Sequence, residues 1–477
     1  VVVTGANSVW SNAASVVVGD MNGASSNNLV IANGGWVISD VALIGGDASC
    51  SNNAVWVTGN GSVWTNSGNF FLGGNGSYNS LIITNDGRVF NNDGHVGYNP
   101  DATFNSVLVS GGNSIWNNSG DLYIGYQGSS NRLTIANGGL VISTSGFIGS
   151  DGSFGGSSNL VVVTGANSVW SNAASVVVGD MNGASSNNLV IANGGWVISN
   201  VALIGGDASC SNNAVWVTGN GSLWTNSGDF FLGGYGSYNS LAITSSGRVV
   251  NASGYIGYFS GANSNFVLVA GGSVWTNNGV LYVGDSGSYN SLIITNAGQV
   301  FNTDGHIGFD TNATFNSALV GGTNSLWNNN GQFHVGTYGS GNSLIITNGA
   351  QVIVTGGSFI GRVFNTASSN SVLVTGAGSV WTNGRDLQVG GDGYSNSLAI
   401  ANGGVVVNSM GFIGYSLSAS NNSALVSGTN SVWNNTNGFA VGYGGAFNSL
   451  VISPVPISTP LSSAATIRPG ATAAALR

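Results

Sequence analysis

The phrase "NSLIIT" at residues 79–84 decides the fold, because it returns along most of the chain with small changes. A second copy reads "NRLTIA" from Asn131, and both copies follow the pattern asparagine, any residue, apolar, any residue, apolar. Such alternation is typical of a β-strand with one buried face. Each copy is too short and too closely bounded by glycine to form a helix. The first asparagine of each copy therefore marks one turn of a repeat.

The spacing of these asparagines defines the period. It is 26 residues, apart from three spacings of 28 and one of 25, over 17 positions. An asparagine amide donates and accepts hydrogen bonds, and asparagine tolerates a left-handed turn. We therefore expect a structural ladder that joins neighbouring coils, made of Asn27, Asn53, Asn79, Asn105, Asn131, Asn159, Asn187, Asn213, Asn239, Asn265, Asn290, Asn316, Asn342, Asn370, Asn396, Asn422 and Asn448.

Each period contains three short apolar runs: the asparagine phrase, a second run such as "RVF" at 88–90, and a third such as "LYIG" at 122–125. This predicts an all-β fold, a single-stranded parallel β-helix of about 18 coils with three short strands per coil. We expect right-handed winding, because a left-handed hexapeptide helix needs multiples of six residues. At about 4.8 Å per coil, the predicted length is roughly 85 Å.

The repeat region is predicted to cover residues 1–453. Within it, residues 1–39 are identical to 161–199, so a block of 160 residues has been duplicated. Cys50 and Cys210 are equivalent residues of the two copies, and we expect them to lie too far apart for a disulfide. Residues 454–477 contain four of the five prolines and break the strand pattern, so we expect an irregular tail.

Composition excludes several classes of function. The chain has a net charge of −9, with seven arginines and no lysine. A nucleic-acid-binding protein needs clustered basic residues to neutralise phosphates, and none occur here. No apolar run of about 18 residues predicts a membrane span. No motif predicts a cofactor.

The sequence "DGHVG" at 93–97, with Asp-Gly-His again at 304–306, resembles the Gly-His signature of sugar-cleaving solenoid enzymes such as polygalacturonases. Such a site needs paired carboxylates and a basic residue, but no Asp-Asp pair and no lysine occur. The sequence therefore predicts a non-enzymatic protein, with a polysaccharide hydrolase or lyase as the alternative. Aspartates such as Asp47 and Asp392 are predicted to be turn residues rather than calcium ligands, because no nine-residue tandem repeat surrounds them.

On the 26-residue frame, the histidines share one slot in the third strand with aromatic residues. Strict alternation in a strand predicts that this slot points outward. An exposed apolar column of this kind usually marks a contact surface, here for sugar rings or for neighbouring rods. The predicted binding column is Phe71, His95, Tyr123, Phe147, Phe231, Tyr255, Tyr282, His306, His334, Phe359 and Phe412.

Every second coil carries the phrase Gly-x-x-Ser-apolar-Trp. The tryptophan follows an inward-facing position, which favours packing in the core. The tryptophans are Trp10, Trp64, Trp116, Trp170, Trp224, Trp275, Trp327, Trp381 and Trp433.

The phrases "NRLTIANGGLV" at 131–141 and "VVVTGANSVW" at 1–10 resemble the repeats shared by bacterial type V autotransporter passengers and PEP-CTERM-associated surface proteins. The resemblance covers residues 1–453 and implies a secreted or cell-surface β-helix. The near-uniform coils, with no unique polar cluster among them, predict an adhesin stalk, a passenger domain or a fibre component. The expected partners are surface glycans or other copies of the chain, associating side by side or end to end. Residues 454–477 match neither a β-barrel translocator nor a Pro-Glu-Pro anchor.

Overall fold

The computed structural model describes residues 1–150, 155–363 and 366–454, and every regular element among them is a β-strand. The predicted all-β class is therefore confirmed. In the same ranges, no helix is long and apolar enough to cross a membrane. Most of the predicted irregular tail, residues 455–477, lies outside the described residues, and the domain boundary at 453 stays a prediction.

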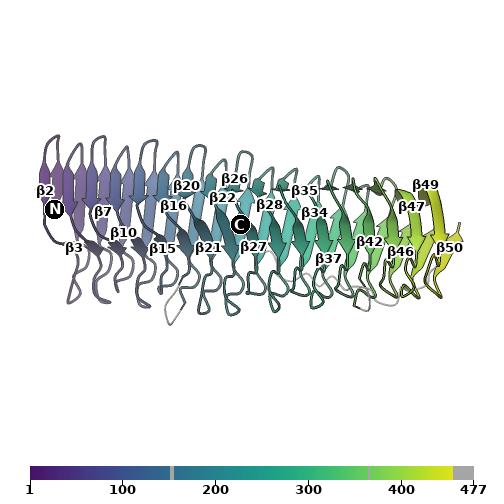
Figure 1. Cartoon of the computed structure of the whole chain (residues 1–477). Helices are drawn as coiled ribbons and strands as arrows, with labels where there is room; N and C mark the ends of the chain where they lie inside the picture. Colours follow the sequence, from purple (N-terminus) through teal and green to yellow (C-terminus); the bar gives the residue numbers. More distant parts are fainter. Residues whose placement is uncertain (151–154, 364–365, 455–477) are drawn as a thin grey trace. The chain divides into compact units, whose positions relative to one another are not determined.

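The strands form two compact units, and each unit is a parallel β-solenoid (Figure 1). Unit 1 comprises Val1–Phe230, Gly234–Leu241 and Ser246–Val250, and unit 2 comprises Phe231–Gly233, Ala242–Ser245 and Asn251–Arg477. The boundary divides the residues of three strands, β27 (Phe230–Leu232), β28 (Ser240–Thr244) and β29 (Arg248–Asn251).

One coil of unit 1 shows the common plan. It consists of β10 (Ser80–Thr84), β11 (Arg88–Asn91) and β12 (Gly94–Val96). The first strand pairs in parallel with β13 (Ser106–Ser110), the first strand of the next coil, and Leu81 lies opposite Val107. This pairing confirms the parallel solenoid and the period of 26 residues.

The other strands of unit 1 follow the same plan. First strands are β1 (Val2–Thr4), β4 (Asn28–Ala32), β7 (Ala54–Thr58), β16 (Arg132–Ala136), β19 (Leu160–Thr164), β22 (Asn188–Ala192) and β25 (Ala214–Thr218). Second strands are β2 (Val9–Ser11), β5 (Trp36–Ser39), β8 (Val63–Asn66), β14 (Ile115–Asn118), β17 (Leu140–Ser143), β20 (Val169–Asn172), β23 (Trp196–Ser199) and β26 (Leu223–Asn226). Third strands are β3 (Val16–Val18), β6 (Ala42–Ile44), β9 (Phe70–Leu72), β15 (Leu122–Ile124), β18 (Gly146–Ile148), β21 (Ser175–Val178) and β24 (Val201–Ile204).

Unit 2 repeats this arrangement. First strands are β31 (Phe266–Ala270), β34 (Ser291–Thr295), β37 (Ser317–Gly321), β40 (Ser343–Thr347), β43 (Ser371–Thr375), β46 (Ser397–Ala401), β48 (Ser423–Ser427) and β50 (Ser449–Ser453). Second strands are β32 (Val274–Asn277), β35 (Gln299–Asn302), β38 (Leu326–Asn329), β41 (Gln351–Val354) and β44 (Val380–Asn383). Third strands are β30 (Gly254–Ile256), β33 (Leu281–Val283), β36 (Gly305–Ile307), β39 (Phe333–Val335), β42 (Ser358–Ile360) and β45 (Leu387–Val389).

Two coils of unit 2 depart from the prediction of three separate strands. In these coils the second and third strands are continuous, as β47 (Val405–Ile413) and β49 (Val432–Val441). The two strands pair with a register shift between Asn408 and Met410. The connection that forms a turn in other coils is extended here, and the register shift lies within it.

The core of each coil follows from alternation along the strands. Leu81, Ile83, Val89 and Val96 are fully buried, whereas Ile82, which lies between two inward residues, is half-buried on the outer surface. Full burial of each such side chain stabilises the fold by roughly 1.5–3 kcal/mol before the entropy of folding is subtracted. Because each coil covers only its neighbours, this core is a stack of rows rather than a globular centre.

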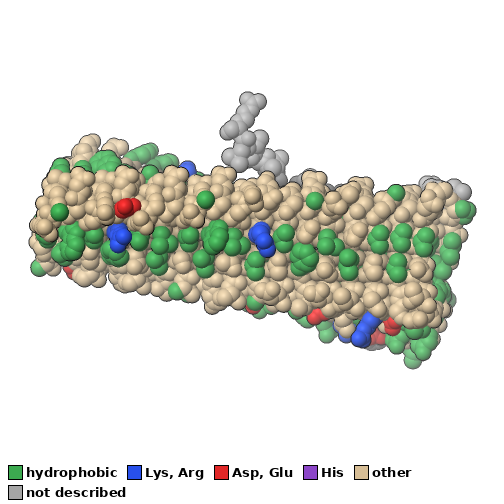
Figure 2. Space-filling view, turned by 90° about the horizontal axis from the view of Figure 1, so that it is seen from above, with side chains coloured by type: hydrophobic (Ala, Val, Ile, Leu, Met, Phe, Trp, Pro, Cys, Tyr) green, Lys and Arg blue, Asp and Glu red, His purple; other side chains and the backbone are tan. Residues whose placement is uncertain are grey.

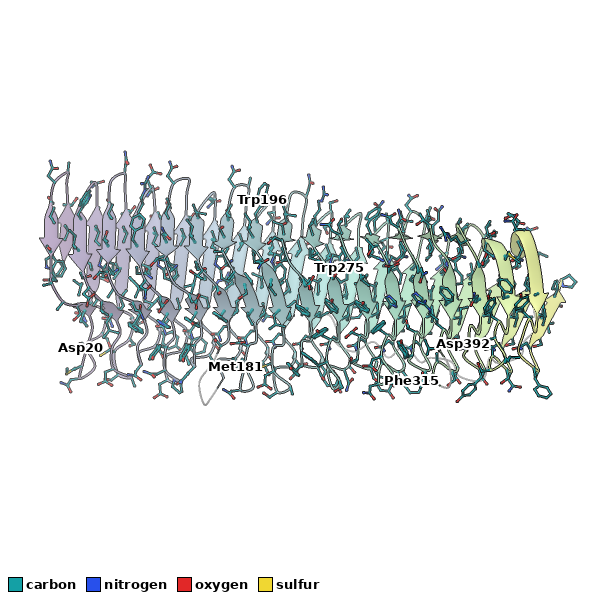
Figure 3. The ribbon with its side chains drawn as sticks, in the orientation of Figure 1. Asp20, Met181, Trp196, Trp275, Phe315 and Asp392 are labelled. Atoms are coloured by element: carbon teal, nitrogen blue, oxygen red, sulfur yellow. The ribbon has the colours of Figure 1, made fainter. Side chains whose placement is uncertain are left out.

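The tryptophan column lies inside this stack, as predicted. Seven tryptophans are fully buried: Trp64, Trp116, Trp170, Trp224, Trp275, Trp327 and Trp381. Each indole needs a hydrogen-bond acceptor in the core, and Trp116 Nε1 donates to Asn91 Oδ1 at 2.8 Å. Trp275 lies among the strands, whereas Trp196 is 45% exposed (Figure 3). Core packing is confirmed for the seven buried tryptophans, while Trp10 and Trp433 are half-buried.

The glycine that ends each third strand makes room for the asparagine ladder. Gly97 has a φ of +77°, and a Cβ added there would lie 2.1 Å from Asn131 Nδ2. Only glycine meets both conditions, because other residues strain at this φ and would collide with the amide. The apolar-Gly ending and the asparagine phrase are therefore two parts of one packing arrangement.

Candidate functional site

The ladder asparagines bond directly from coil to coil. Asn105 Oδ1 accepts hydrogen bonds from the backbone N–H of Asn79 at 2.9 Å and from Asn79 Nδ2 at 3.1 Å. Asn105 Nδ2 also donates to the carbonyl oxygen of Gly76 at 3.0 Å. The inner members, from Asn53 to Asn422, are at most 1% exposed. Their amides are thus occupied within the protein and closed to an external ligand.

The predicted binding column forms ring stacks within each unit. In unit 1, His95 lies between Phe71 and Tyr123, with ring centroids 4.8 and 4.9 Å apart, and Tyr123 stacks on Phe147. In unit 2 the stack comprises Phe231, Tyr255, Tyr282, His306, His334 and Phe359, with centroids 4.5–5.1 Å apart. Phe412 contacts Tyr415 and Tyr443 by its edge. The side chains of the column thus stack on the outer side of the third strands, but they are not fully exposed to solvent.

The expectation that this column is exposed is wrong for four of its members. His95, His306, His334 and Phe412 are 6%, 8%, 1% and 5% exposed, and the other seven residues are half-buried. Burial lowers the pKa of His95 to about 4, although the charge of Asp93 opposes the shift. Burial is also the main cause of the raised pKa of Tyr123. Whether any part of this column binds a ligand stays a prediction.

A second aromatic column covers the first. In several coils the glycine that ends the third strand is followed by an aromatic residue, and Tyr98 packs edge-on against His95 at 5.0 Å. Tyr126 does the same to Tyr123 at 5.3 Å. We name these residues the cover column: Tyr98, Tyr126, Tyr258, Phe309, Tyr415 and Tyr443. The repeated phrases "VGYN" at 96–99 and "IGYQ" at 124–127 were the signal that could have revealed it.

A further set of exposed aromatic residues lies directly before the ladder asparagines. We name them the loop aromatics. Their exposed fractions are 51–84%, and Figure 3 shows Phe315 among the loops below the strands. Tyr78 stacks on Phe104 at 5.0 Å, and Tyr289 stacks on Phe315 at 5.3 Å. The loop aromatics are Tyr78, Phe104, Tyr238, Tyr289, Phe315 and Phe447.

The backbone of the loop aromatics is left-handed. Their φ values lie between +55° and +60°. This conformation costs a bulky residue roughly 1–2 kcal/mol, and other coils place Ser, Asn or Gly at the same position, as at Ser130 and Gly341. Sequence reasoning missed these residues, although the phrase "SYN" at 77–79, 237–239 and 288–290 was visible.

Apolar side chains also lie on the outer surface of the strands. In unit 1 the centre of the first strands presents Val30, Trp56, Ile82, Leu108, Val162, Val190 and Trp216. Trp36 and Trp196 belong to a similar column on the second strands and are 49% and 45% exposed. Figure 2 shows such hydrophobic side chains in rows on one face, with a few arginines among them.

Cysteines and metal ligands add no further site in the ranges that the structure describes. Cys50 and Cys210 are free and buried. No group of three or more His, Cys, Asp or Glu side chains among the described residues could hold a metal ion.

Comparisons with known proteins were made by sequence and by structure. No family model and no curated protein matches the chain. Among solved structures, the chain is similar to the crystal structure of a TibC-catalysed, hyper-glycosylated fragment of TibA, with a TM-score of 0.40 and 13% sequence identity. The similarity covers 76% of this chain and 99% of that fragment.

Proposed function

We propose that the chain is a non-enzymatic structural and adhesive β-helix at the cell surface, and that the loop aromatics contact glycans. The observation that carries this proposal is the exposure of stacked aromatic pairs on a left-handed backbone. These residues bear a conformational cost and bury little surface in return. Strain of this kind is retained where a function requires it.

The geometry of the pairs suits saccharides. Tyr289 and Phe315 are 59% and 55% exposed, and their rings stack 14° from parallel. Aromatic faces attract the C–H groups of pyranose rings, which carry partial positive charge, because the π system is negative above the ring. The repeat supports the structural role, since coil after coil presents such positions on a regular scaffold. The resemblance of the repeats supports a place at the cell surface.

Other copies of the chain are the second expected partner. The outer apolar columns, with Trp36 and Trp196 about half exposed, support side-by-side association. Sedimentation at increasing concentration tests this, and a mass that stays monomeric would remove self-association from the proposal.

Glycan contact is tested by substituting the residues that other coils carry. Tyr289→Ser and Phe315→Ser should weaken binding to a glycan array while leaving thermal stability unchanged or higher, because serine tolerates this φ better and the Tyr78–Phe104 pair remains. Tyr338→Ser is the matched control, since Tyr338 is an exposed aromatic residue that is not one of the loop aromatics. Unchanged glycan binding by the double variant would contradict the proposal.

A carbohydrate-active enzyme is the second candidate function, and one observation favours it. The pKa of Asp285 is raised to about 6, first by burial and then by the negative charge of Asp310. A glycoside hydrolase uses a pair of carboxyl groups, one of which has a raised pKa and acts as the general acid. This pair was not visible in the sequence, because the two residues lie in neighbouring coils. Release of reducing ends from a polysaccharide, lost in Asp285→Asn, would favour the enzyme over the adhesin.

A further inference from the structure

A polar hollow of about 500 Å³ lies beside the paired histidines of unit 2. Its lining includes Asp304, His306, Gln332, His334, Arg362 and Arg385. The side chains come from four successive coils, so this group is assembled only when the coils stack. Neither the ladder nor the loop aromatics take part in it.

The coils at this place differ in two respects from the coil of His95. In the coils without the tryptophan phrase, three residues, Thr355 to Gly357, separate β41 from β42, whereas two separate β11 from β12. The residue that follows Gly361 is Arg362, whereas Tyr98 follows the equivalent glycine beside His95. A guanidinium therefore lies beside His334, where an aromatic ring lies beside His95.

Arg362 contacts three other side chains at the hollow. Its Nη1 lies 3.2 Å from His334 Nε2 and donates to Gln332 Oε1 at 3.3 Å, and its guanidinium lies 4.9 Å from the centre of the Phe359 ring. A guanidinium can only donate, so His334 Nε2 accepts and the ring proton is on Nδ1. That Nδ1 is buried and has no hydrogen-bond partner.

His306 and His334 are neutral at ordinary pH. Their rings are 2° from parallel with centroids 4.5 Å apart, and His306 Nδ1 lies 2.9 Å from Thr337 Oγ1. Burial, together with the charge of Arg362, lowers the pKa of His306 to about 3. The same causes and the neighbouring His306 lower the pKa of His334. The positive charge at the hollow therefore comes from Arg362 and Arg385.

Neither arginine forms an ion pair with a carboxylate in the described parts of the chain. The nearest acidic group of the lining, Asp304, uses Oδ1 to accept the backbone N–H of Gln332. Asp93 has the same role in unit 1, where it accepts the N–H of Asp121. Asp304 thus has a structural role that recurs in another coil, whereas no such role is seen for the guanidiniums of Arg362 and Arg385. They form a local excess of positive charge on a chain of net charge −9.

We infer that this hollow binds the carboxylate of an acidic saccharide. A guanidinium matches a carboxylate with two parallel hydrogen bonds, and Gln332 offers an amide to the neighbouring sugar hydroxyls. The inference rests on the proposed function in one respect, namely that the ligand is a saccharide. The loop aromatics would contact neutral and acidic sugar rings alike. The inference assigns preference for acidic sugars to Arg362 and Arg385.

The test compares oligogalacturonate with the same oligomer after full methyl esterification, by calorimetric titration of the whole chain. We expect wild type to bind the acid at least tenfold more tightly than the ester. Arg362→Gln and Arg385→Gln should each remove most of this preference, and Asp304→Asn should increase it while keeping the acceptor for Gln332. Arg88→Gln is the matched control and should change nothing.

Opposite effects at Arg362 and Asp304 cannot come from a general loss of folding. His334→Phe provides a further check, because Phe359 already occupies the same column and the stack should persist while the Arg362 acceptor is lost. Equal affinity for acid and ester in wild type would overturn the inference, as would displacement of the oligomer by acetate at the oligomer's own concentration. Weaker binding of both the acid and the ester in Tyr289→Ser and Phe315→Ser, with the ratio of the two affinities unchanged, would separate this site from the loop aromatics.

Discussion

His95 in unit 1 and His334 in unit 2 occupy the same slot of the third strand, but their neighbours differ. His95 stacks between Phe71 and Tyr123 and is closed by Tyr98. His334 stacks between His306 and Phe359 and contacts a guanidinium instead of a covering ring. Both side chains are buried, and His334 lines the polar hollow.

The difference shows which part of a coil determines a site. The third strand provides a stack of flat rings in both regions, and a histidine is accommodated there as one more ring. The residue after the terminal glycine differs between the two regions, because Tyr98 packs edge-on against His95 whereas Arg362 contacts His334 through its guanidinium. A Gly-His phrase in this solenoid is therefore part of the repeat, and the departure from the repeat lies in the cover column.

The largest expected effect concerns what the two regions share. Asn105→Leu near His95 and Asn342→Leu near His334 should each destabilise the fold by about 3–5 kcal/mol. Each change removes an oxygen that accepts two hydrogen bonds, so a buried backbone N–H and a buried amide lose their acceptor. Urea unfolding and hydrogen exchange in adjacent coils measure the loss.

Asn117→Leu is the control for the ladder variants, because Asn117 lies on the outer surface opposite Ile142. Its effect should stay within about 0.5 kcal/mol. A clearly larger loss in one ladder variant than in the other would show that the two regions do not share the same interior.

The second effect is a pH dependence. The pKa of His95 is about 4 in the folded chain and near 6.5 when unfolded, so the unfolded state binds more protons between these values. Stability should fall by about 3 kcal/mol as pH drops from 7 to 4. His95→Phe should remove that part of the loss, measured as urea midpoints across the pH range. His306→Phe should remove a loss that continues to about pH 3. Identical pH profiles for wild type and His95→Phe would show that His95 is protonated in the fold.

The third effect compares the coil of His334 with the next Trp coil. Trp327 Nε1 donates to Asn302 Oδ1 at 2.7 Å, whereas Trp381 Nε1 has no partner because Val354 stands at the equivalent position. Trp327→Phe should therefore cost about 1–2 kcal/mol more than Trp381→Phe, which loses the same volume but no hydrogen bond. Thermal unfolding of the pair gives the comparison. Equal losses would mean that both indoles are satisfied.

The smallest effect is expected at the hollow itself. Arg362→Gln without ligand should change the free energy of unfolding by less than about 1 kcal/mol, because its bonds to Gln332 and His334 are partly solvated. Arg88→Gln serves as the reference surface change. A loss of several kcal/mol would indicate that Arg362 supports the fold rather than a ligand.

Much of the architecture was accessible from the sequence. Alternation in phrases such as residues 79–84 determines which side chains enter the core, and the period determines which residues stack. The ladder positions and the burial of the Trp column followed from these two patterns. Exposure did not follow, because alternation tells only that a residue such as His95 leaves the core and not what covers it.

The sequence by itself determined the coil: its period, its strands and its inward faces, since these depend on local alternation and turn chemistry. Only the tertiary structure decided what each outer surface became. Tyr98 packs against the ring of His95, and Arg362 lies beside the ring of His334. The charge of Asp310 acts on Asp285 from a neighbouring coil. These outcomes depend on distances between residues about one period apart, and such distances exist only after the coils have stacked.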